Sequence, residues 1–318
     1  GHPVHTLLAL GAGRIDLTAR GDLQLETVFN PTVSGQPNGT GFSDLSVFFT
    51  YAPDSAVRLL SLSGDLALMN DSTTIEQAAR SVRFNPTAAL FVYPPSVRAS
   101  APEGSIDLSS NFWLFPAARG GLDLLAGHDV RAEGAVVGVS DGDPGLLPSP
   151  ARPSANYTNA NVEITFDHAA KLLHAADPVP IRVIAAAGDL LGGNWRFAKA
   201  ARLIAGRDIV DLNVQGQNIN PGDVTIVQAG RDLRYGASVT REIRLGGPGR
   251  LAVTAGRDVD LGFSAGITTV GNALNGALPA RGAGVTVLVG AAAPPAYAGF
   301  IRRYFAPGAR YSGLLTEA

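Results

Sequence analysis

The chain of 318 residues contains no cysteine, and its only lysines are Lys171 and Lys199. The absence of cysteine excludes disulfides, thiolate nucleophiles and cysteine metal ligands. Charged residues make up 16% of the sequence and the formal net charge is −2, so nothing in the composition attracts nucleic acid or acidic lipid in general. The sequence shows neither a signal peptide nor an apolar run of membrane-spanning length. We therefore expect a piece of a longer protein, with any export signal outside it.

Glycine, proline and apolar residues are plentiful. The sequence has 38 glycines and 21 prolines, and apolar residues account for 46% of it. This balance is typical of a turn-rich β protein rather than of a helical bundle. Aromatic residues amount to 7% and are scattered, with no row on which sugar rings would stack.

An internal repeat organises the chain. Its template is an aspartate with aliphatic residues five and three positions before it and one position after it. Spacings of 19, 24 and 26 residues separate the last four aspartates of the series. Chance does not satisfy such a template seven times, so we predict a repeat architecture. The aspartates of the seven copies are Asp22, Asp65, Asp129, Asp189, Asp208, Asp232 and Asp258.

The template predicts two short strands joined at a polar corner, because aliphatic residues alternate on both sides of each aspartate. A glycine beside the aspartate permits the sharp turn between the strands. A unit of roughly 20 residues cannot bury its own apolar face, so the copies must stack on one another. We predict an all-β fold, a parallel β-helix or β-solenoid of roughly ten coils. The three aliphatic positions should face inward, while aspartates and arginines form exposed ladders along the corners.

Several stretches depart from the template. Residues 97–108 read as a degenerate coil, and 262–282 as a Gly/Asn-rich insertion before a last strand at 284–289. We place a shaft at 1–293 and a helical cap, or a linker to a following domain, at 294–318. The expected excursions from the shaft are residues 27–56 (with a strand at 45–51), 70–95 (with a capped helix at 75–82) and 134–160.

Seven segments of the second half carry a resemblance to a known family, and three of them contain an Ala-Gly-Arg-Asp corner. The segments are Arg182–Leu190, Ala205–Ile209, Gln217–Asn218, Ala229–Leu233, Gly247–Leu261, Ala265–Asn272 and Leu278–Gly290. Together they resemble the C-terminal part of large bacterial filamentous-haemagglutinin-like exoproteins. The resemblance covers residues 181–305 and is patchier before them.

This resemblance implies a right-handed β-helical shaft, secreted through an outer-membrane transporter partner and exposed on the bacterial surface. Its implied role is structural and adhesive, with a host-cell or surface receptor or glycan as the partner. Two alternatives stay open. A stalk that presents a toxin or effector domain would continue past Ala318 into a globular module. A carbohydrate-active β-helix enzyme would need two close carboxylates in a cleft beside stacked aromatic residues. Fold alone does not decide between them.

The corner residues have a structural interpretation. Arg207, Arg231 and Arg257 each precede a corner aspartate, and we expect such pairs to join neighbouring coils. The tripeptide Arg20-Gly21-Asp22 spells an integrin-binding sequence, yet the repeat already explains its glycine and aspartate. It is therefore a weak adhesion candidate.

Enzymatic chemistry finds little support in the sequence. His168 and His174 lack evident carboxylate or serine partners, and no nucleophile-elbow, zinc-protease or phosphate-loop motif occurs. We predict no catalytic, cofactor-binding or metal-binding residues, and no nucleic-acid or membrane-inserted partner.

Overall fold

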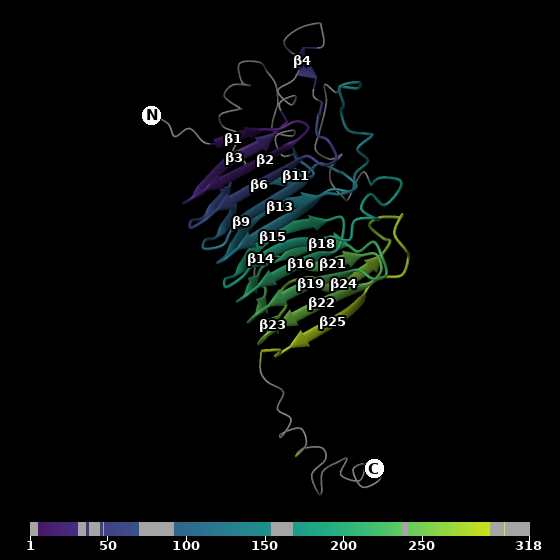
Figure 1. Cartoon of the computed structure of the whole chain (residues 1–318). Coiled ribbons are helices and arrows are strands. Elements are labelled where there is room, and N and C mark those ends of the chain that lie inside the picture. Colours follow the sequence, from purple (N-terminus) through teal and green to yellow (C-terminus); the bar gives the residue numbers. More distant parts are fainter. Residues whose placement is uncertain are drawn as a thin grey trace.

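The computed structural model describes residues 6–30, 36–37, 45–46, 48–69, 92–153, 168–236, 241–292 and 302. Two parallel sheets run through this part of the chain, and a short antiparallel pair, β4 (Gln36–Pro37) with β5 (Leu45–Ser46), lies apart from them. Strands alternate between the two sheets along the sequence, so the chain winds from one sheet to the other and back (Figure 1).

The nine-stranded sheet holds one six- or five-residue strand from each coil, which gives nine described coils rather than ten. Its strands, in spatial and sequence order, are β2 (Arg14–Ala19), β6 (Ala56–Ser61), β9 (Ser96–Ala101), β12 (Gly121–Ala126), β14 (Ile181–Ala185), β16 (Ala201–Ala205), β19 (Val224–Ala229), β22 (Arg250–Ala255) and β25 (Gly284–Val289).

The 14-stranded sheet takes up the strands that follow the corners, as one long strand in some coils and as two shorter strands in others. Its strands are β1 (Thr6–Ala9), β3 (Leu23–Phe29), β7 (Leu66–Leu68), β8 (Val92–Tyr93), β10 (Ile106–Leu108), β11 (Phe112–Leu114), β13 (Val130–Val139), β15 (Leu190–Phe197), β17 (Ile209–Val210), β18 (Asn213–Gln217), β20 (Leu233–Arg234), β21 (Glu242–Gly246), β23 (Val259–Asp260) and β24 (Gly266–Gly271).

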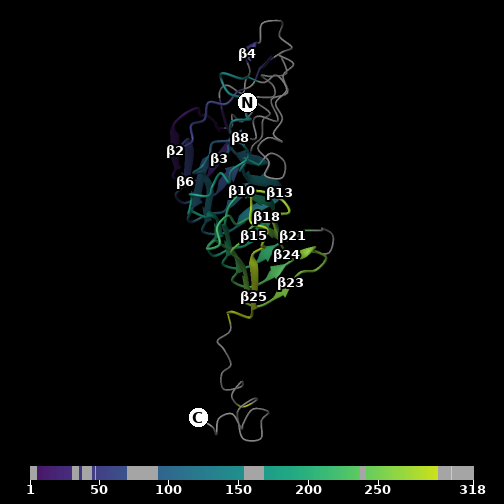
Figure 2. The same ribbon diagram turned by 90° about the vertical axis from the view of Figure 1, so that its right-hand side faces the viewer.

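The prediction of an all-β fold with parallel strands is confirmed. Figure 2 shows the two walls from the side, with β2 and β6 on one side and β13, β18 and β21 on the other. Within the described residues these strands form two sheets, consistent with a parallel β-helix, and not a closed solenoid. No helix in this part of the chain is long and apolar enough to cross a membrane.

The core lies between the sheets and is built from columns of in-register side chains. The middle column of the nine-stranded sheet runs Leu17, Leu59, Ala99, Leu124, Val183, Leu203, Val227, Val253 and Val287. A second column, next to the corners, is nearly all alanine: Ala19, Ser61, Ala101, Ala126, Ala185, Ala205, Ala229, Ala255 and Val289. Stacked aliphatic side chains of matched size pack densely without a rotamer cost for the alanines.

The aliphatic position after each aspartate faces inward, as predicted. Six of these side chains are buried, and Val259 packs against the core from a partly buried position. The six are Leu23, Leu66, Val130, Leu190, Ile209 and Leu233.

The inward positions before the aspartate were predicted wrongly in two copies. Before Asp65 and Asp189 the corner is one residue longer, so the inward residues are Ser61 and Ala185. Leu62, which the template places inward, is 49% exposed. A one-residue insertion reverses the face of every side chain in a strand, because side chains alternate with a period of two.

Other boundaries also differ from the prediction. The degenerate coil at 97–108 is confirmed as β9 and β10, and the last strand is confirmed as β25. In contrast, β24 lies inside the stretch expected as an insertion, and β5 covers only two residues of the expected strand. β13 runs on to Val139 through Gly134, whose φ is 79°.

Two expected helices lie outside the described residues. They are the helix at 75–82 and the C-terminal cap at 294–318, and the structure does not support the cap. The last described coil presents the apolar strand β25 uncovered, with Val287 and Val289 about half exposed, 46% and 50%.

Candidate functional site

The corner aspartates form a ladder that ties each coil to the next. The side-chain Oδ1 of one aspartate accepts a hydrogen bond from the backbone N–H of the corner residue one coil further on. The donor–acceptor distances are 2.9 Å from Asp65 N to Asp22, 2.8 Å from Asp189 N to Asp129 and 2.9 Å from Asp208 N to Asp189. A carboxylate at this position therefore satisfies an N–H that the turn leaves without a strand partner.

The ladder contains one member that the template missed. Ser105 occupies the aspartate position in the coil that carries β9 and β10. Its N–H donates to Asp65 Oδ1 at 2.7 Å, and its hydroxyl oxygen accepts from Asp129 N at 3.4 Å. Gly104-Ser105 before an aliphatic residue was the available signal, since serine shares with aspartate an oxygen that caps a backbone N–H.

Arginines add a second link in the later coils. Arg207 makes a bidentate pair with Asp189, at 3.1 Å from Nε and 2.5 Å from Nη2. Arg231 pairs in the same way with Asp208 and Arg257 with Asp232. Each guanidinium thus bonds to the aspartate of the previous coil, one coil from its own corner.

This pairing changes the electrostatics of the corner. The hydrogen bond from Arg207 holds the pKa of Asp189 below its ordinary value, although burial acts in the opposite direction. Exposure varies along the ladder: Asp22, Asp65 and Asp258 are exposed as expected, whereas Asp208 is only 6% exposed. Paired and covered carboxylates of this kind stabilise turns.

The tripeptide Arg20-Gly21-Asp22 lies at the first corner of the stack. Asp22 uses one carboxylate oxygen for the ladder, and the Arg20 carbonyl accepts a 2.6 Å hydrogen bond from the Ser63 hydroxyl. The repeat therefore accounts for most of what this tripeptide does structurally, and the Arg20 side chain is left exposed.

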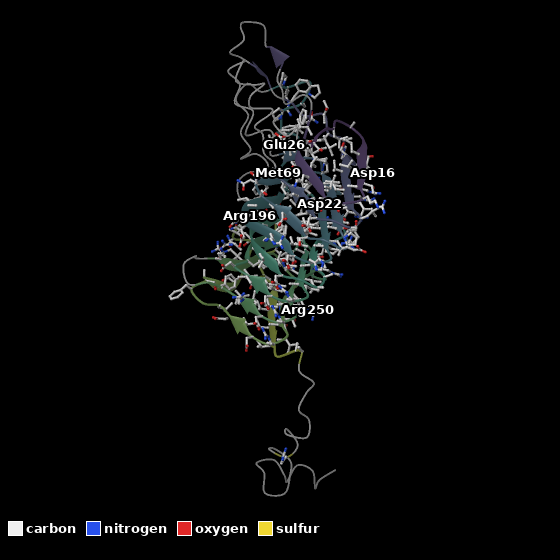
Figure 3. The ribbon with its side chains drawn as sticks, turned by 90° about the vertical axis from the view of Figure 1, so that its left-hand side faces the viewer. Asp16, Asp22, Glu26, Met69, Arg196 and Arg250 are labelled. Atoms are coloured by element: carbon white, nitrogen blue, oxygen red, sulfur yellow. The ribbon has the colours of Figure 1, made fainter. Side chains whose placement is uncertain are left out.

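A groove on the outer face of the nine-stranded sheet carries charge that the repeat does not explain. Its volume is about 550 Å³, and β2, β6, β9, β12 and β14 form its floor. Segments around Arg119 and Val179 line it as well. Figure 3 shows this sheet in side view, with Asp16 near its N-terminal end and Arg250 near its C-terminal end.

Strand pairing brings six charged residues into one row along this face. The row contains four arginines and two aspartates, and the three positions that follow it, Ile226, Ala252 and Thr286, carry no charge. In order, the charged members are Asp16, Arg58, Arg98, Asp123, Arg182 and Arg202. The four from Arg58 to Arg182 line the groove, whereas Asp16 and Arg202 lie in the row beyond its lining.

The first five members of the row, with Arg14, make two Arg–Asp–Arg triads. Asp123 contacts Arg98 at 3.0 Å and Arg182 at 2.5 Å. Asp16 contacts Arg14 at 2.8 Å and Arg58 only at 3.9 Å. Each triad keeps one excess positive charge, and these arginine side chains are 38–53% exposed.

A buried ion pair is part of the groove's lining. Lys199 Nζ lies 2.5 Å from Asp177 Oδ2, and both side chains are less than 10% exposed. Burial lowers the pKa of Lys199, and its contact with Asp177 offsets this only in part. Burial alone would raise the pKa of Asp177, yet the hydrogen bond from Lys199 holds it below its ordinary value. We assign this pair to anchoring the segment at 177–180 beside the sheet.

A separate polar cluster is buried where the excursions meet the 14-stranded sheet. Asp141 accepts hydrogen bonds from Gln217 at 2.8 Å and from Asn275 at 3.1 Å, and its other oxygen lies 2.9 Å from His168 Nδ1. His168 Nε2 faces the carbonyl of Leu274 at 2.9 Å. Both ring nitrogens thus face acceptors, an arrangement that the doubly protonated ring satisfies.

His168 therefore has a carboxylate partner that sequence reasoning missed. Asp141 lies 27 residues before it, at a distance in sequence that carries no motif. His174 is buried nearby, with Nε2 at 3.0 Å from the carbonyl of Ser140, and burial lowers its pKa. The contacts join β18 to the connections after β13, before β14 and after β24, so we assign the cluster a structural role.

Within the described ranges no group of three or more His, Asp or Glu residues is arranged to hold a metal ion. Comparisons with protein-family models, with curated proteins and with solved structures give no match to the chain. The resemblance to filamentous-haemagglutinin-like exoproteins consequently stays a prediction from the quoted segments.

Proposed function

We propose that the chain is a structural and adhesive shaft segment of a secreted, surface-exposed bacterial exoprotein. The observation that carries the proposal is the in-register stack of nine coils, in which the corner ladder and the alanine column repeat from coil to coil. A structure of this kind depends on contacts between neighbouring coils, so it extends along one axis and holds its length.

The proposed shaft is a right-handed β-helix, and nine coils correspond to a length of about 43 Å at ~4.8 Å per coil. Side chains inside the stack supply rigidity, whereas outer faces and excursions are free to make contacts. Export through an outer-membrane transporter partner follows from the family resemblance and belongs to the proposal.

The experiment combines shape with adhesion. Spin labels on cysteines introduced at exposed positions of β2 and β25 should lie about 38 Å apart, which is eight strand intervals at ~4.8 Å. Beads coated with the chain should bind host cell surfaces. Ala229→Asp supplies the control, because a charge in the alanine column breaks the stack while the outer surface keeps its composition. A clearly shorter distance between the labels would contradict the stack of coils. Equal adhesion of the unfolded variant would contradict adhesion through the folded surface.

A further inference from the structure

The charged row on the nine-stranded sheet contains two places where like charges stand side by side. Arg58 pairs in register with Arg98 on the neighbouring strand, and Arg182 pairs in register with Arg202. Like charges directly opposite each other on adjacent strands destabilise a sheet. At the corners, by contrast, the arginines pair with aspartates one coil away.

We propose that these two arginine pairs are seats for anionic groups of a linear acidic polysaccharide that lies along the stack across the strands. The inference rests on the proposed function in taking a glycan as the adhesive partner. It adds the class of glycan, the residues that contact it and its direction on the surface.

The first seat lies between Arg58 and Arg98. Arg98 uses Nε for its contact with Asp123, and Arg58 touches Asp16 only at 3.9 Å, so both keep terminal N–H groups for another acceptor. Their side chains are 52% and 53% exposed, which leaves them accessible to a large ligand. Two guanidinium groups on adjacent strands can hold one sulfate or carboxylate group between them, each through charge-assisted hydrogen bonds.

The second seat lies between Arg182 and Arg202. Arg182 gives Nη2 to Asp123, while its Nε is buried and has no hydrogen-bond partner in the described part of the chain. Arg202 is exposed and makes no ion pair there. The buried Nε is closed to a surface ligand, but the terminal nitrogens of Arg182 and Arg202 can hold one anionic group between them.

The distance between the two seats determines the length of ligand that can occupy both. Three strand intervals separate them, which corresponds to about 14 Å at the usual distance between parallel strands. A single small anion cannot reach both seats, whereas a chain of charged sugars spans them and gains from both. Asp123 stands between the seats and repels any charge placed there, so the groove favours separated anionic groups over a uniform charge.

The lining of the groove favours a polysaccharide over nucleic acid. None of the described residues that line it is aromatic, and single-stranded nucleic acids bind largely by stacking bases on aromatic side chains. The groove recognises its ligand by charge and hydrogen bonding instead.

Fluorescence anisotropy with labelled polymers tests the proposal on the full chain. Labelled dextran sulfate supplies sulfate groups, polygalacturonate supplies carboxylates, and neutral dextran of the same length is the uncharged control. We expect binding of at least one acidic polymer, none of dextran, and weakening as salt is raised. The tighter of the two acidic polymers identifies the source of the anion.

Matched variants locate the site. Arg58→Ala/Arg98→Ala and Arg182→Ala/Arg202→Ala should each weaken binding about tenfold, the effect of losing a pair of charge-assisted hydrogen bonds. Arg234→Ala/Arg281→Ala removes the same charge from exposed positions that do not line the groove and should leave affinity unchanged. Oligosaccharides too short to span both seats should bind the wild type no better than they bind either double variant.

Three results would overturn the proposal. They are a folded wild type that ignores both acidic polymers, an equal loss in the control variant, and displacement by single-stranded DNA at lower concentration than by dextran sulfate. Circular dichroism and melting of the same samples separate these results from failure of the shaft. If the β fold is intact but neither polymer binds, only the polysaccharide proposal is rejected. If the β fold is absent, the proposed shaft function is rejected.

Discussion

The corner ladder and the outer row of the nine-stranded sheet are both lines of arginine and aspartate, but they balance their charges differently. At the corners each of Arg207, Arg231 and Arg257 has its own aspartate one coil away, at 2.5–3.1 Å. In the row four arginines share two aspartates. Charge that is matched coil by coil holds a fold together, whereas surplus charge on a flat outer face is available to a ligand.

The largest expected effect comes from the alanine column behind the corners. Ala229→Asp should destabilise the protein by about 4 kcal/mol or more, because it places an unpaired charge in a fully packed column. Denaturant unfolding measures the loss. Gln228→Asp is the matched control, since Gln228 is exposed on the same strand and should change stability little. An unchanged melting temperature for Ala229→Asp would mean that the assigned inner face is wrong.

A smaller loss is expected from a corner carboxylate. Asp208→Ala removes the acceptor for Arg231 and for the N–H of Asp232, and should cost about 1.5–3 kcal/mol. Asp208→Asn keeps an oxygen for the backbone N–H and should lose only part of this. Urea unfolding of the two variants ranks the two contacts. Equal losses would show that the arginine pair alone stabilises the corner.

The pH dependence of folding stability distinguishes the contribution of buried His174 from that of the corner aspartates. His174 has a lowered pKa, so the unfolded chain binds its proton first and stability falls as pH drops below about 6.5. Asp189 also has a lowered pKa, and its contribution is present above about 3.9 and disappears as pH falls through the folded value. The free energy of unfolding should therefore decline in two stages as the pH is lowered from neutral, first through His174 and then through Asp189. His174→Gln should abolish the first stage, and persistence of that stage would assign it to another group.

The smallest effects on stability are expected from two arginines, one in the corner ladder and one in the outer row. Arg257→Ala removes an exposed corner pair and should lower stability only slightly. Arg58→Ala removes a like-charged neighbour of Arg98 and should leave stability unchanged or raise it slightly. Thermal melting at low salt measures both, and added salt should reduce the difference between them. A clear destabilisation by Arg58→Ala would show that this arginine is part of the scaffold.

Much of the fold follows from sequence alone. The repeat around the seven aspartates predicted parallel strands, the corners and the inward residue after each aspartate, because these depend on a period of two and on local turn chemistry. The same reasoning failed at Leu62, where the corner gains one residue. It also missed β24, whose glycines and threonines resemble a loop composition.

The candidate site could not be predicted, because it depends on the register in which neighbouring strands pair. Asp16, Arg58, Arg98, Asp123, Arg182 and Arg202 lie in one row although excursions of different lengths separate them in the chain. The sequence by itself determined that each coil stacks on the next, since each repeat must bury one apolar face. Only the tertiary structure decided which outward residues become neighbours, because parallel pairing fixes their alignment regardless of the length of chain between strands.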